Sequence, residues 1–179
     1  MTQPGLLTIC GALRAASTNR QLLAEAVRLF GPATVTGANL RLPLYDGDLE
    51  AIGIPPEVAL LHAQIGAADG IVISTPEYNK ALSGVLKNAL DWVSRVPGPA
   101  PWMGKPVAIL SAAAGRAGGE RAQYSLRLCL NAFRPHVLPG PEFMLADSSH
   151  AFDAAGHLSD PRSVKSLTEL MADLRALTV

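Results

Sequence analysis

The sequence alternates short runs of apolar residues with longer stretches in which apolar residues return every three or four positions. Continuous apolar runs are typical of strands buried on both faces, and the longer spacing is typical of helices. The runs predict strands at 6–10, 33–40, 71–73, 107–110 and 136–145. The periodic stretches predict helices at 18–30, 56–68, 82–93, 120–133 and 161–177. Strands that alternate with helices in this way form a parallel sheet with helices on both faces.

Five such strands fit a doubly wound sheet with the strand order 2-1-3-4-5. We therefore predict an α/β fold of the flavodoxin-like type, a three-layer α/β/α sandwich with a five-stranded parallel sheet. The 179 residues match the size of one domain, and we expect a single domain over residues 1–179. Residues 41–56 are expected to form a loop, in which Asp46 and Asp48 shape turns rather than bind a metal.

Charge and composition argue against several classes of function. Fifteen Lys and Arg residues balance fifteen Asp and Glu residues, and no stretch concentrates the basic ones. A surface for nucleic acid or for an acidic membrane is therefore not expected. No apolar run approaches the roughly 20 residues that cross a bilayer, and no secretory signal pattern opens the chain. Two cysteines, Cys10 and Cys129, cannot form a disulfide framework, so we expect buried thiols in a cytoplasmic protein.

The first strand runs into a loop of small residues that opens a helix. The first N–H groups of a helix have no partner within it and carry partial positive charge, so they attract anions. Arg14 would add a full positive charge. Neutral hydrogen-bonding groups come from Ser17, Thr18 and Asn19. An ordinary capped helix stays open as an alternative, because Thr18 and Gln21 fit a Thr-x-x-Gln capping box. The loop lacks the glycines of a dinucleotide site and the Gly-Lys-Ser/Thr of a P-loop, which favours a mononucleotide phosphate.

Two further loops, 74–81 and 111–119, follow the third and fourth predicted strands. In a sheet of this order, ligands bind beyond the carboxyl ends of the strands where the order reverses, which groups all three loops. The second loop offers backbone fixed by Pro76, the ring of Tyr78 and the amide of Asn79, which suit a flat, hydrogen-bonding ring. The third loop is rich in Gly and Ala, so an aromatic plane can approach its backbone closely. A phosphate site beside a site for a planar heterocycle predicts FMN, with three ordinary strand-to-helix turns as the alternative.

Four motifs resemble those of NADPH-dependent FMN reductases. Residues 11–19, Gly-Ala-Leu-Arg-Ala-Ala-Ser-Thr-Asn, resemble that family's Gly-Ser-Leu-Arg-x-x-Ser-x-Asn opening. Residues 76–79 match its Pro-Glu-Tyr-Asn loop, and residues 86–92 match its Leu-Lys-Asn-Ala-x-Asp-Trp helix. Residues 118–123, Gly-Gly-Glu-Arg-Ala-Gln, resemble its third loop and the helix that follows. The resemblance covers nearly the whole chain.

The resemblance implies a flavodoxin-like fold with bound FMN. The cofactor-binding residues that it implies in the first loop are Gly11, Leu13, Arg14, Ser17, Thr18 and Asn19, with Arg14, Ser17 and Asn19 on the phosphate. Those that it implies around the isoalloxazine ring are Pro76, Glu77, Tyr78 and Asn79, with Ser111 and Gly115 under the third loop. FMN carries the redox chemistry at its N5 atom, so no side chain is expected to be catalytic, and no metal is expected.

The activity that the resemblance implies is an FMN-dependent NAD(P)H oxidoreductase. Electrons from NADPH or NADH would pass through FMN to a quinone, a free flavin, an azo or nitro compound, or a metal oxyanion such as chromate. A non-catalytic FMN-binding protein for electron transfer or regulation stays the alternative. The resemblance also implies a homodimer or homotetramer. The predicted helix 120–133 favours it as well, because Arg121, Tyr124 and Leu128 form an outward face that Trp92 would extend.

The chain departs from the family pattern at two positions. Ala12 stands where serine is usual, which removes one hydroxyl from the phosphate loop. Lys80 follows the Pro-Glu-Tyr-Asn motif. Two interpretations of Lys80 stay open: a solvated loop lysine, or a cation that favours an anionic substrate or the phosphate of NADPH.

Overall fold

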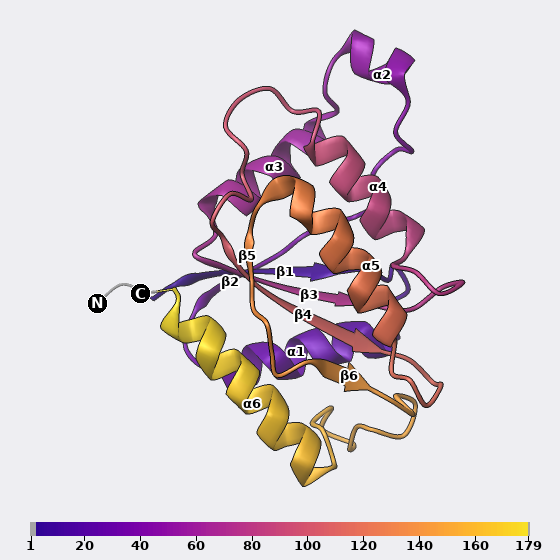
Figure 1. Cartoon of the computed structure of the whole chain (residues 1–179), viewed down its shortest axis with the longest axis vertical. Coiled ribbons are helices and arrows are strands. Elements are labelled where there is room, and N and C mark those ends of the chain that lie inside the picture. Colours follow the sequence, from indigo (N-terminus) through magenta and orange to yellow (C-terminus); the bar gives the residue numbers. More distant parts are fainter. Residues whose placement is uncertain (1–2, 179) are drawn as a thin grey trace.

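The computed structural model describes residues 3–178 and has a central sheet with helices on both faces (Figure 1). The strands are β1 (Gly5–Cys10), β2 (Thr34–Gly37), β3 (Gly70–Thr75), β4 (Pro106–Ala112), β5 (His136–Val137) and β6 (Phe143–Leu145). The helices are α1 (Thr18–Phe30), α2 (Gly47–Ile52), α3 (Pro56–Ala67), α4 (Gly84–Val93), α5 (Glu120–Leu130) and α6 (Pro161–Ala176), with a 3₁₀ turn, η1 (Asn131–Phe133), after α5. Among these described helices, none combines the length and the apolar character that a bilayer crossing requires.

The strand order confirms the prediction of a flavodoxin-like sheet. Parallel pairing runs β2-β1-β3-β4-β5, so β1 and β3 are neighbours and the order reverses between them. The register sets Leu7 of β1 beside Ile71 of β3, and Ile73 of β3 beside Ile109 of β4. Because these strands are parallel, the carboxyl ends of β1, β3 and β4 lie at one edge of the sheet.

The fifth position of the sheet is divided between two short strands. β5 pairs with the start of β4, and β6 pairs with its end, from Leu110 onward. The segment between them contains Pro139 and Pro141, which have no N–H group to donate to a neighbouring strand. The prediction of one strand over 136–145 is therefore wrong, and within the described residues the sheet has six strands rather than five.

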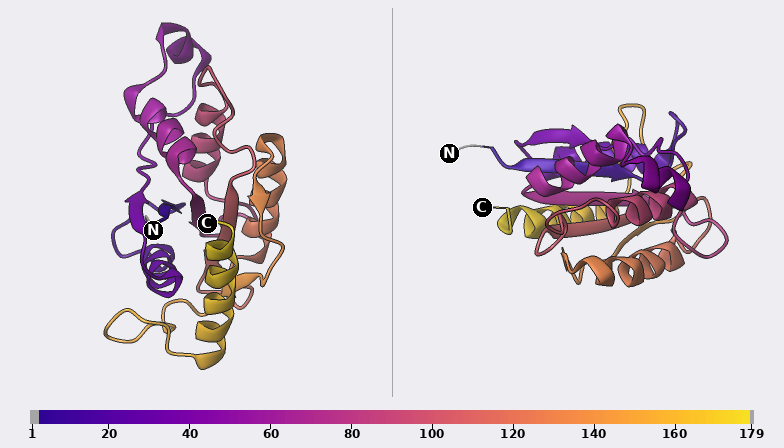
Figure 2. Two further views of the ribbon diagram at one scale, coloured as in Figure 1. Left: turned by 90° about the vertical axis from the view of Figure 1, so that its left-hand side faces the viewer. Right: turned by 90° about the horizontal axis from the view of Figure 1, so that it is seen from above.

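Helices lie on both sides of the sheet (Figure 2), and successive residues of the central strands face two separate cores. Leu6 and Val72 pack in the core that α1 and α6 cover, whereas Leu7 and Ile71 pack in the core that α3, α4 and α5 cover. Every residue of β3 and of β4 is buried. Burial on both faces explains why these strands appear in the sequence as continuous apolar runs.

A short helix that the sequence did not predict, α2, lies in an arm that stands away from the sheet (Figure 1). Asp46 caps α2, because its carboxylate accepts the N–H group of Asp48 at 2.9 Å. The two aspartates therefore shape the local backbone, as expected. None of the residues of α2 is buried, so the helix is held by its caps and its connections rather than by a core.

Two buried side chains of α4 fix the arm. Asn88 Nδ2 and Trp92 Nε1 both donate to the carbonyl oxygen of Pro43 at 2.9 Å, and Asn88 Oδ1 accepts the N–H group of Tyr45 at 2.8 Å. The Trp92 ring is fully buried and meets the Tyr45 ring edge-on at 5.2 Å. The expectation that Trp92 extends an outer surface is therefore wrong, because the arm covers it.

The amino edge of the sheet carries the start of β1 and the end of α6 (Figure 1). Gly5, the first residue of β1, donates its N–H group to the Asp69 carboxylate at 2.7 Å. Gly70, the first residue of β3, lies so close to Thr178 that a Cβ atom on it would come within 2.7 Å of Thr178 Cγ2. The carboxyl edge, on the opposite side, is left to the loops that follow β1, β3 and β4.

Candidate FMN site at the carboxyl edge

Three loops leave the carboxyl ends of β1, β3 and β4 and gather at one edge of the sheet (Figure 1). They span residues 11–17, 76–83 and 113–119, and they lead into α1, α4 and α5. β1 and β3 lie where the strand order reverses, which is where a sheet of this type binds ligands. The structure therefore brings together the three loops that the sequence singled out.

Ser17 caps α1 at the end of the first loop. Its Oγ accepts the N–H group of Asn19 at 3.2 Å, and its carbonyl oxygen accepts the N–H group of Arg20 at 3.0 Å. Ser17 has the extended backbone of an N-cap, and Thr18 is already the first helical residue. The capping box considered for Thr18 and Gln21 is therefore wrong.

The first loop presents backbone donors to solvent. Within residues 3–178, the N–H groups of residues 14–18 donate to no protein acceptor. Arg14, Ala15 and Ala16 are exposed in front of the helix. Unengaged N–H groups at a helix N-terminus, together with an arginine, suit a phosphate group.

Gly11 allows the first loop to pass close to the second. Its N–H group donates to the carbonyl oxygen of Ser74 at 2.8 Å. A Cβ atom on Gly11 would lie 3.0 Å from both Thr75 Oγ1 and Ser83 Oγ. A side chain at this position would therefore push the two loops apart.

Asn19 is buried, and its amide joins three segments. Nδ2 donates to the carbonyl oxygen of Ala112 at 2.9 Å, while Oδ1 accepts the Ala112 N–H group at 3.0 Å and the Ser74 hydroxyl at 2.8 Å. The side chain expected on the phosphate thus lies below the loop surface and ties the start of α1 to the ends of β3 and β4. Its partners Ser74 and Ala112 were missed, because contacts across 55 and 93 residues leave no local pattern.

Ser148 is a further residue of the site region that the sequence analysis missed. It is buried, and its Oγ lies 3.1 Å from Thr18 Oγ1. Its N–H group donates to the carbonyl oxygen of Ala113 at 3.1 Å. Ser148 therefore connects the first loop to the third from a segment, 146–150, that carries no recognisable motif.

The second loop folds into a two-residue hairpin above the buried Pro76. Tyr78 and Ala81 exchange both backbone hydrogen bonds, each of 3.1 Å. Asn79 and Lys80 have φ angles of 52° and 67°, the left-handed conformation that a type I′ turn requires at both central positions. Tyr78 is 58% exposed, so its ring and the hairpin backbone are accessible to a ligand.

Glu77 links the second loop to α5. Its Oε2 accepts the backbone N–H group of Arg121 at 3.0 Å, and its Oε1 lies 3.4 Å from Arg121 Nη1. α5 has Gly119 at its N-cap, which offers no side chain to cap the helix. Glu77 supplies that acceptor from another loop, so its carboxylate is engaged within the protein.

The third loop runs so close to its neighbours that it needs two glycines. A Cβ atom on Gly118 would lie 2.7 Å from the carbonyl carbon of Met144, and one on Gly119 would lie 2.8 Å from Ser111 Cβ. Both glycines also have positive φ angles. Gly115 is different, because it is exposed and has open space where a side chain would be. The loop is therefore tight at its end and accessible at its tip.

Ser111 lies beneath the third loop, fully buried. Its hydroxyl accepts a hydrogen bond from Gln123 Nε2 at 2.9 Å, and the same nitrogen donates to the carbonyl oxygen of Phe143 at 2.7 Å. Ser111 and Gln123 thus join β4, α5 and β6 below the loop. Ser111, which the resemblance implied as a cofactor-binding residue, is buried in this structure and hydrogen-bonded to Gln123.

A hollow of about 650 Å³ opens between Glu77 and residues 113–121. Its walls are mostly backbone and small side chains, with Arg116 and Arg121 as cations. The first-loop donors, the exposed hairpin and this hollow can hold a ligand that has a phosphate at one end and a flat ring at the other. Across residues 3–178, no group of three or more His, Cys, Asp and Glu side chains is placed to hold a metal ion.

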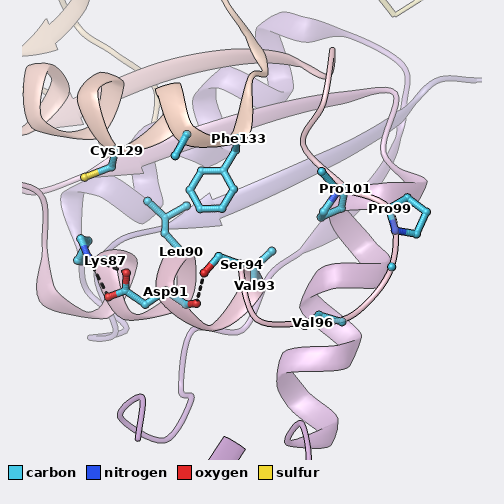
Figure 3. Close-up of a pocket in the computed structure, with 13 residues that line it drawn as sticks. Lys87, Leu90, Asp91, Val93, Ser94, Val96, Pro99, Pro101, Cys129 and Phe133 are labelled. Carbon is cyan, nitrogen blue, oxygen red and sulfur yellow. Dashed lines mark hydrogen bonds and ion pairs between the residues drawn. The ribbon is translucent and has the colours of Figure 1, made fainter. Parts of the chain in front are cut away.

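A separate cavity of about 490 Å³ lies between α4, the end of α5 and residues 96–101 (Figure 3). At one end Lys87 Nζ lies 2.6 Å from Asp91 Oδ1, and this hydrogen bond raises the pKa of Lys87. None of the lining residues belongs to the three loops. Cys129 lines this cavity and is only half-buried, so the expectation of a buried thiol is confirmed for Cys10 alone.

Comparison with known proteins gives the family. The family model described as NADPH-dependent FMN reductase matches residues 4–150. The chain belongs to the NADPH-dependent FMN reductase family. The matched residues include all three loops, and the prediction of an oxidoreductase that uses FMN and NAD(P)H is confirmed at the level of the family.

Individual relatives resemble the chain over most of its length. The NAD(P)H-dependent FMN reductase PA1204 of Pseudomonas aeruginosa is 46% identical over 164 residues, which cover 88% of this chain and 86% of that protein. The quinone reductase of Escherichia coli K12 is 42% identical over 144 residues, which cover 78% of this chain and 76% of that protein. The solved structure of FerB, a flavoenzyme NAD(P)H:(acceptor) oxidoreductase from Paracoccus denitrificans, has a TM-score of 0.89 at 29% identity and covers 98% of this chain and 97% of that one.

Ala12, which departs from the pattern of the FMN reductase family, belongs to a core rather than to the loop surface. Its methyl group is buried with residues of the α1 and α6 face. The exposed part of the first loop is residues 14–16, with the Arg14 guanidinium, and the buried Ser17 closes it against α1.

Proposed function

We propose that this protein is an FMN-dependent NAD(P)H oxidoreductase that passes electrons to a quinone. One observation carries the proposal: a helix N-terminus with unengaged N–H groups, an exposed hairpin and a glycine-lined hollow share the edge where the strand order reverses. The relatives in E. coli and in Solanum tuberosum are named a quinone reductase and an NAD(P)H:quinone oxidoreductase, which supports a quinone as acceptor. Free flavins, azo and nitro compounds and chromate are the other candidate acceptors.

We assign the FMN phosphate to the first loop. Arg14 would supply the charge, and the N–H groups of residues 14–18 would donate to the phosphate oxygens. Ser17 is buried and its Oγ accepts from Asn19, so the hydroxyl proton remains free to donate to a phosphate seated on the loop. Gly11 and Asn19 then act as positioning residues that hold the loop against β3 and β4.

We assign the flavin ring to the space between residues 76–79 and the third loop at Gly115. FMN, when bound, supplies the redox chemistry, so the residues of the chain bind and orient. Glu77 already binds Arg121, and none of the four histidines lies in the three loops. We therefore assign no general acid or base to the protein and leave the redox step to FMN.

The visible spectrum of the purified protein and its reaction with NADPH test the proposal. Absorption peaks near about 370 and 450 nm would report bound flavin. Mixing with NADPH without oxygen should bleach the flavin rapidly, and added benzoquinone should restore the colour. Flavin that binds but is not bleached would favour the non-catalytic electron-transfer or regulatory protein. Protein that binds no FMN would contradict both functions.

We also propose a homodimer or homotetramer that uses the outward face of α5. The helix buries Leu126 and Leu130 toward the sheet, while Tyr124 and Leu128 are 50% and 73% exposed. Tyrosine and arginine are enriched at interfaces, and a two-fold axis would bring this face against its own copy. Light scattering at micromolar concentration tests it, and a single-chain mass with full NADPH turnover would contradict it. The cytoplasmic location stays a prediction.

A further inference from the structure

Each of the three loops carries one exposed cation. Arg14 lies on the first loop, Lys80 on the hairpin of the second, and Arg116 on the third. Within the described range, 3–178, none of the three forms an ion pair with a carboxylate. All three positive charges therefore face solvent at the edge that holds the site.

The carboxylates at this edge do not balance its cations. Glu77 is paired with Arg121, which leaves Glu120 as the other carboxylate of the three loops and their helix starts. Asp147, in the segment beside the third loop, lies 2.9 Å from His150. The three loop cations have no carboxylate partner among the described residues, whereas Glu77 is neutralised by Arg121, so the loop edge carries a small excess of positive charge. Such a region raises the local concentration of anionic ligands.

Lys80 occupies a backbone position that favours glycine. It is the second central residue of the type I′ turn, with a φ angle of 67°. A residue with a Cβ atom is strained in this conformation, whereas glycine is not. Strain of this kind beside a ligand site points to a role for the side chain. The sequence left open whether Lys80 is a solvated loop lysine or a cation that binds an anionic ligand. The turn geometry favours the cation that binds a ligand.

The three cations divide between two ligands. Arg14 lies with the free N–H groups of the first loop, to which the FMN phosphate is assigned. Arg116 and Glu77 both line the hollow assigned to the ring. Lys80 lies three residues after Glu77, in the exposed hairpin of the second loop. We propose that Lys80 and Arg116 bind phosphate groups of the electron donor, NADPH or NADH. This inference rests on the proposed function, and it assigns to Lys80 and Arg116 the binding of NADPH or NADH at the same site.

The charges of the two substrates indicate that Lys80 and Arg116 bind the electron donor rather than the acceptor. Both nicotinamide nucleotides carry a negatively charged pyrophosphate, and NADPH carries an additional 2′-phosphate. Quinones and nitro compounds are neutral, so the positive charge of the loop edge does not strengthen their binding. A metal oxyanion such as chromate would gain from it, and the choice of acceptor in the experiment separates the two cases.

The test compares Lys80→Gly, Arg116→Ala and the double variant with wild type. Lys165→Ala on α6 removes one exposed cation, paired with Glu169 on the same helix at 3.9 Å, and serves as the control for loss of a surface charge outside the loops. NADPH and NADH are varied in turn with benzoquinone as a neutral acceptor, at low and high salt. We expect kcat/KM for NADPH to fall about threefold to tenfold in each single variant, mainly through KM, and further in the double variant. The salt dependence of kcat/KM should weaken in parallel.

Two further measurements separate lost binding from a damaged fold. Lys80→Gly removes the strain of the positive φ angle at this position. The Tm of the variant should therefore equal or exceed that of wild type, while its kcat/KM for NADPH falls. Lys80→Arg should restore most of the efficiency, because it restores the charge. A larger loss for NADPH than for NADH would assign the contact to the 2′-phosphate, and an equal loss would assign it to the pyrophosphate.

Two results would overturn the inference while leaving the proposed function intact. One is a double variant with wild-type kcat/KM for both donors. The other is a loss seen with chromate but not with benzoquinone, which would assign the two cations to the acceptor. A wild-type protein whose flavin is not reduced by NADPH would instead overturn the proposed function itself, and the inference with it.

Discussion

The carboxylate of Glu77 and the backbone N–H group of Arg121 meet at 3.0 Å, although the two residues lie 44 positions apart in the chain. α5 begins after a glycine that cannot cap it, so a residue of the second loop completes its first turn. The second and third loops of the site are therefore joined by a helix cap.

Replacing Glu77 by Ala should lower the free energy of unfolding by about 1–2 kcal/mol, because the first turn of α5 loses its acceptor. Urea titration of the FMN-free protein measures the change without a contribution from ligand binding. Glu77→Gln keeps a side-chain oxygen and should lose less. An alanine variant as stable as wild type would show that the contact does not act as a cap.

Replacing Arg14 by Ala should weaken FMN binding by about 1.5–3 kcal/mol, which is typical of a hydrogen bond to a charged group. Arg14 is exposed, so the stability of the FMN-free protein should stay unchanged. Fluorescence titration with FMN measures the affinity. Unchanged affinity would remove Arg14 from the phosphate site.

Replacing Asn19 by Ala should destabilise the protein by about 3 kcal/mol, because it leaves buried polar groups of Ser74 and Ala112 without partners. Asn39→Ala is the matched control, since Asn39 is exposed and accepts one N–H group, from Arg41. Its effect should stay within about 0.5 kcal/mol. Equal effects of the two changes in urea titrations would refute the positioning role of Asn19.

Replacing Tyr78 by Ala should leave the fold intact, because the hairpin is held by backbone hydrogen bonds and the ring is exposed. The flavin absorption spectrum or the turnover with a quinone should change, since the ring is placed beside the assigned flavin position. A variant that keeps both the spectrum and the turnover of wild type would make Tyr78 a surface aromatic.

Glu25 should contribute a pH-dependent part of the stability. Its buried carboxylate accepts two hydrogen bonds from Arg28, at 2.7 and 2.8 Å, and these are the main cause of its lowered pKa. The stabilisation is complete above the pKa of the unfolded chain, about 4.3, and is lost as the pH falls through the lower pKa of the folded state. Wild type should therefore exceed Glu25→Gln in unfolding free energy at pH 7, and the gap should shrink toward pH 3. A gap that is independent of pH would contradict this assignment.

Most elements of the fold could be predicted because burial leaves a periodic pattern. β3 and β4 are buried on both faces and appear as apolar runs. α2 buries none of its residues, so it leaves no apolar stripe to recognise. The two prolines at 139 and 141 are visible in the sequence, but the pairing of β6 with the end of β4 is a long-range contact that they do not specify.

The location of the site could be predicted, whereas several of its internal contacts could not. The alternation of strands and helices predicts a parallel sheet, and the three loops follow once the strand order 2-1-3-4-5 is assumed. Asn19 reaches Ala112 across 93 residues, and Thr18 reaches Ser148 across 130, so no local spacing indicates either contact. Glu77 belongs to the Pro-Glu-Tyr-Asn motif, which is visible in the sequence. Its role as the cap of α5 depends on how the second and third loops meet, and the sequence does not show this.

The start of β1 and the end of α6 share the amino edge of the sheet, on the side opposite to the three loops. A tether attached at either end would hold the molecule with its loops turned away from the support. The protein could therefore be fused to a partner or coupled to an electrode surface through its ends, and small molecules in solution would still reach the loop edge.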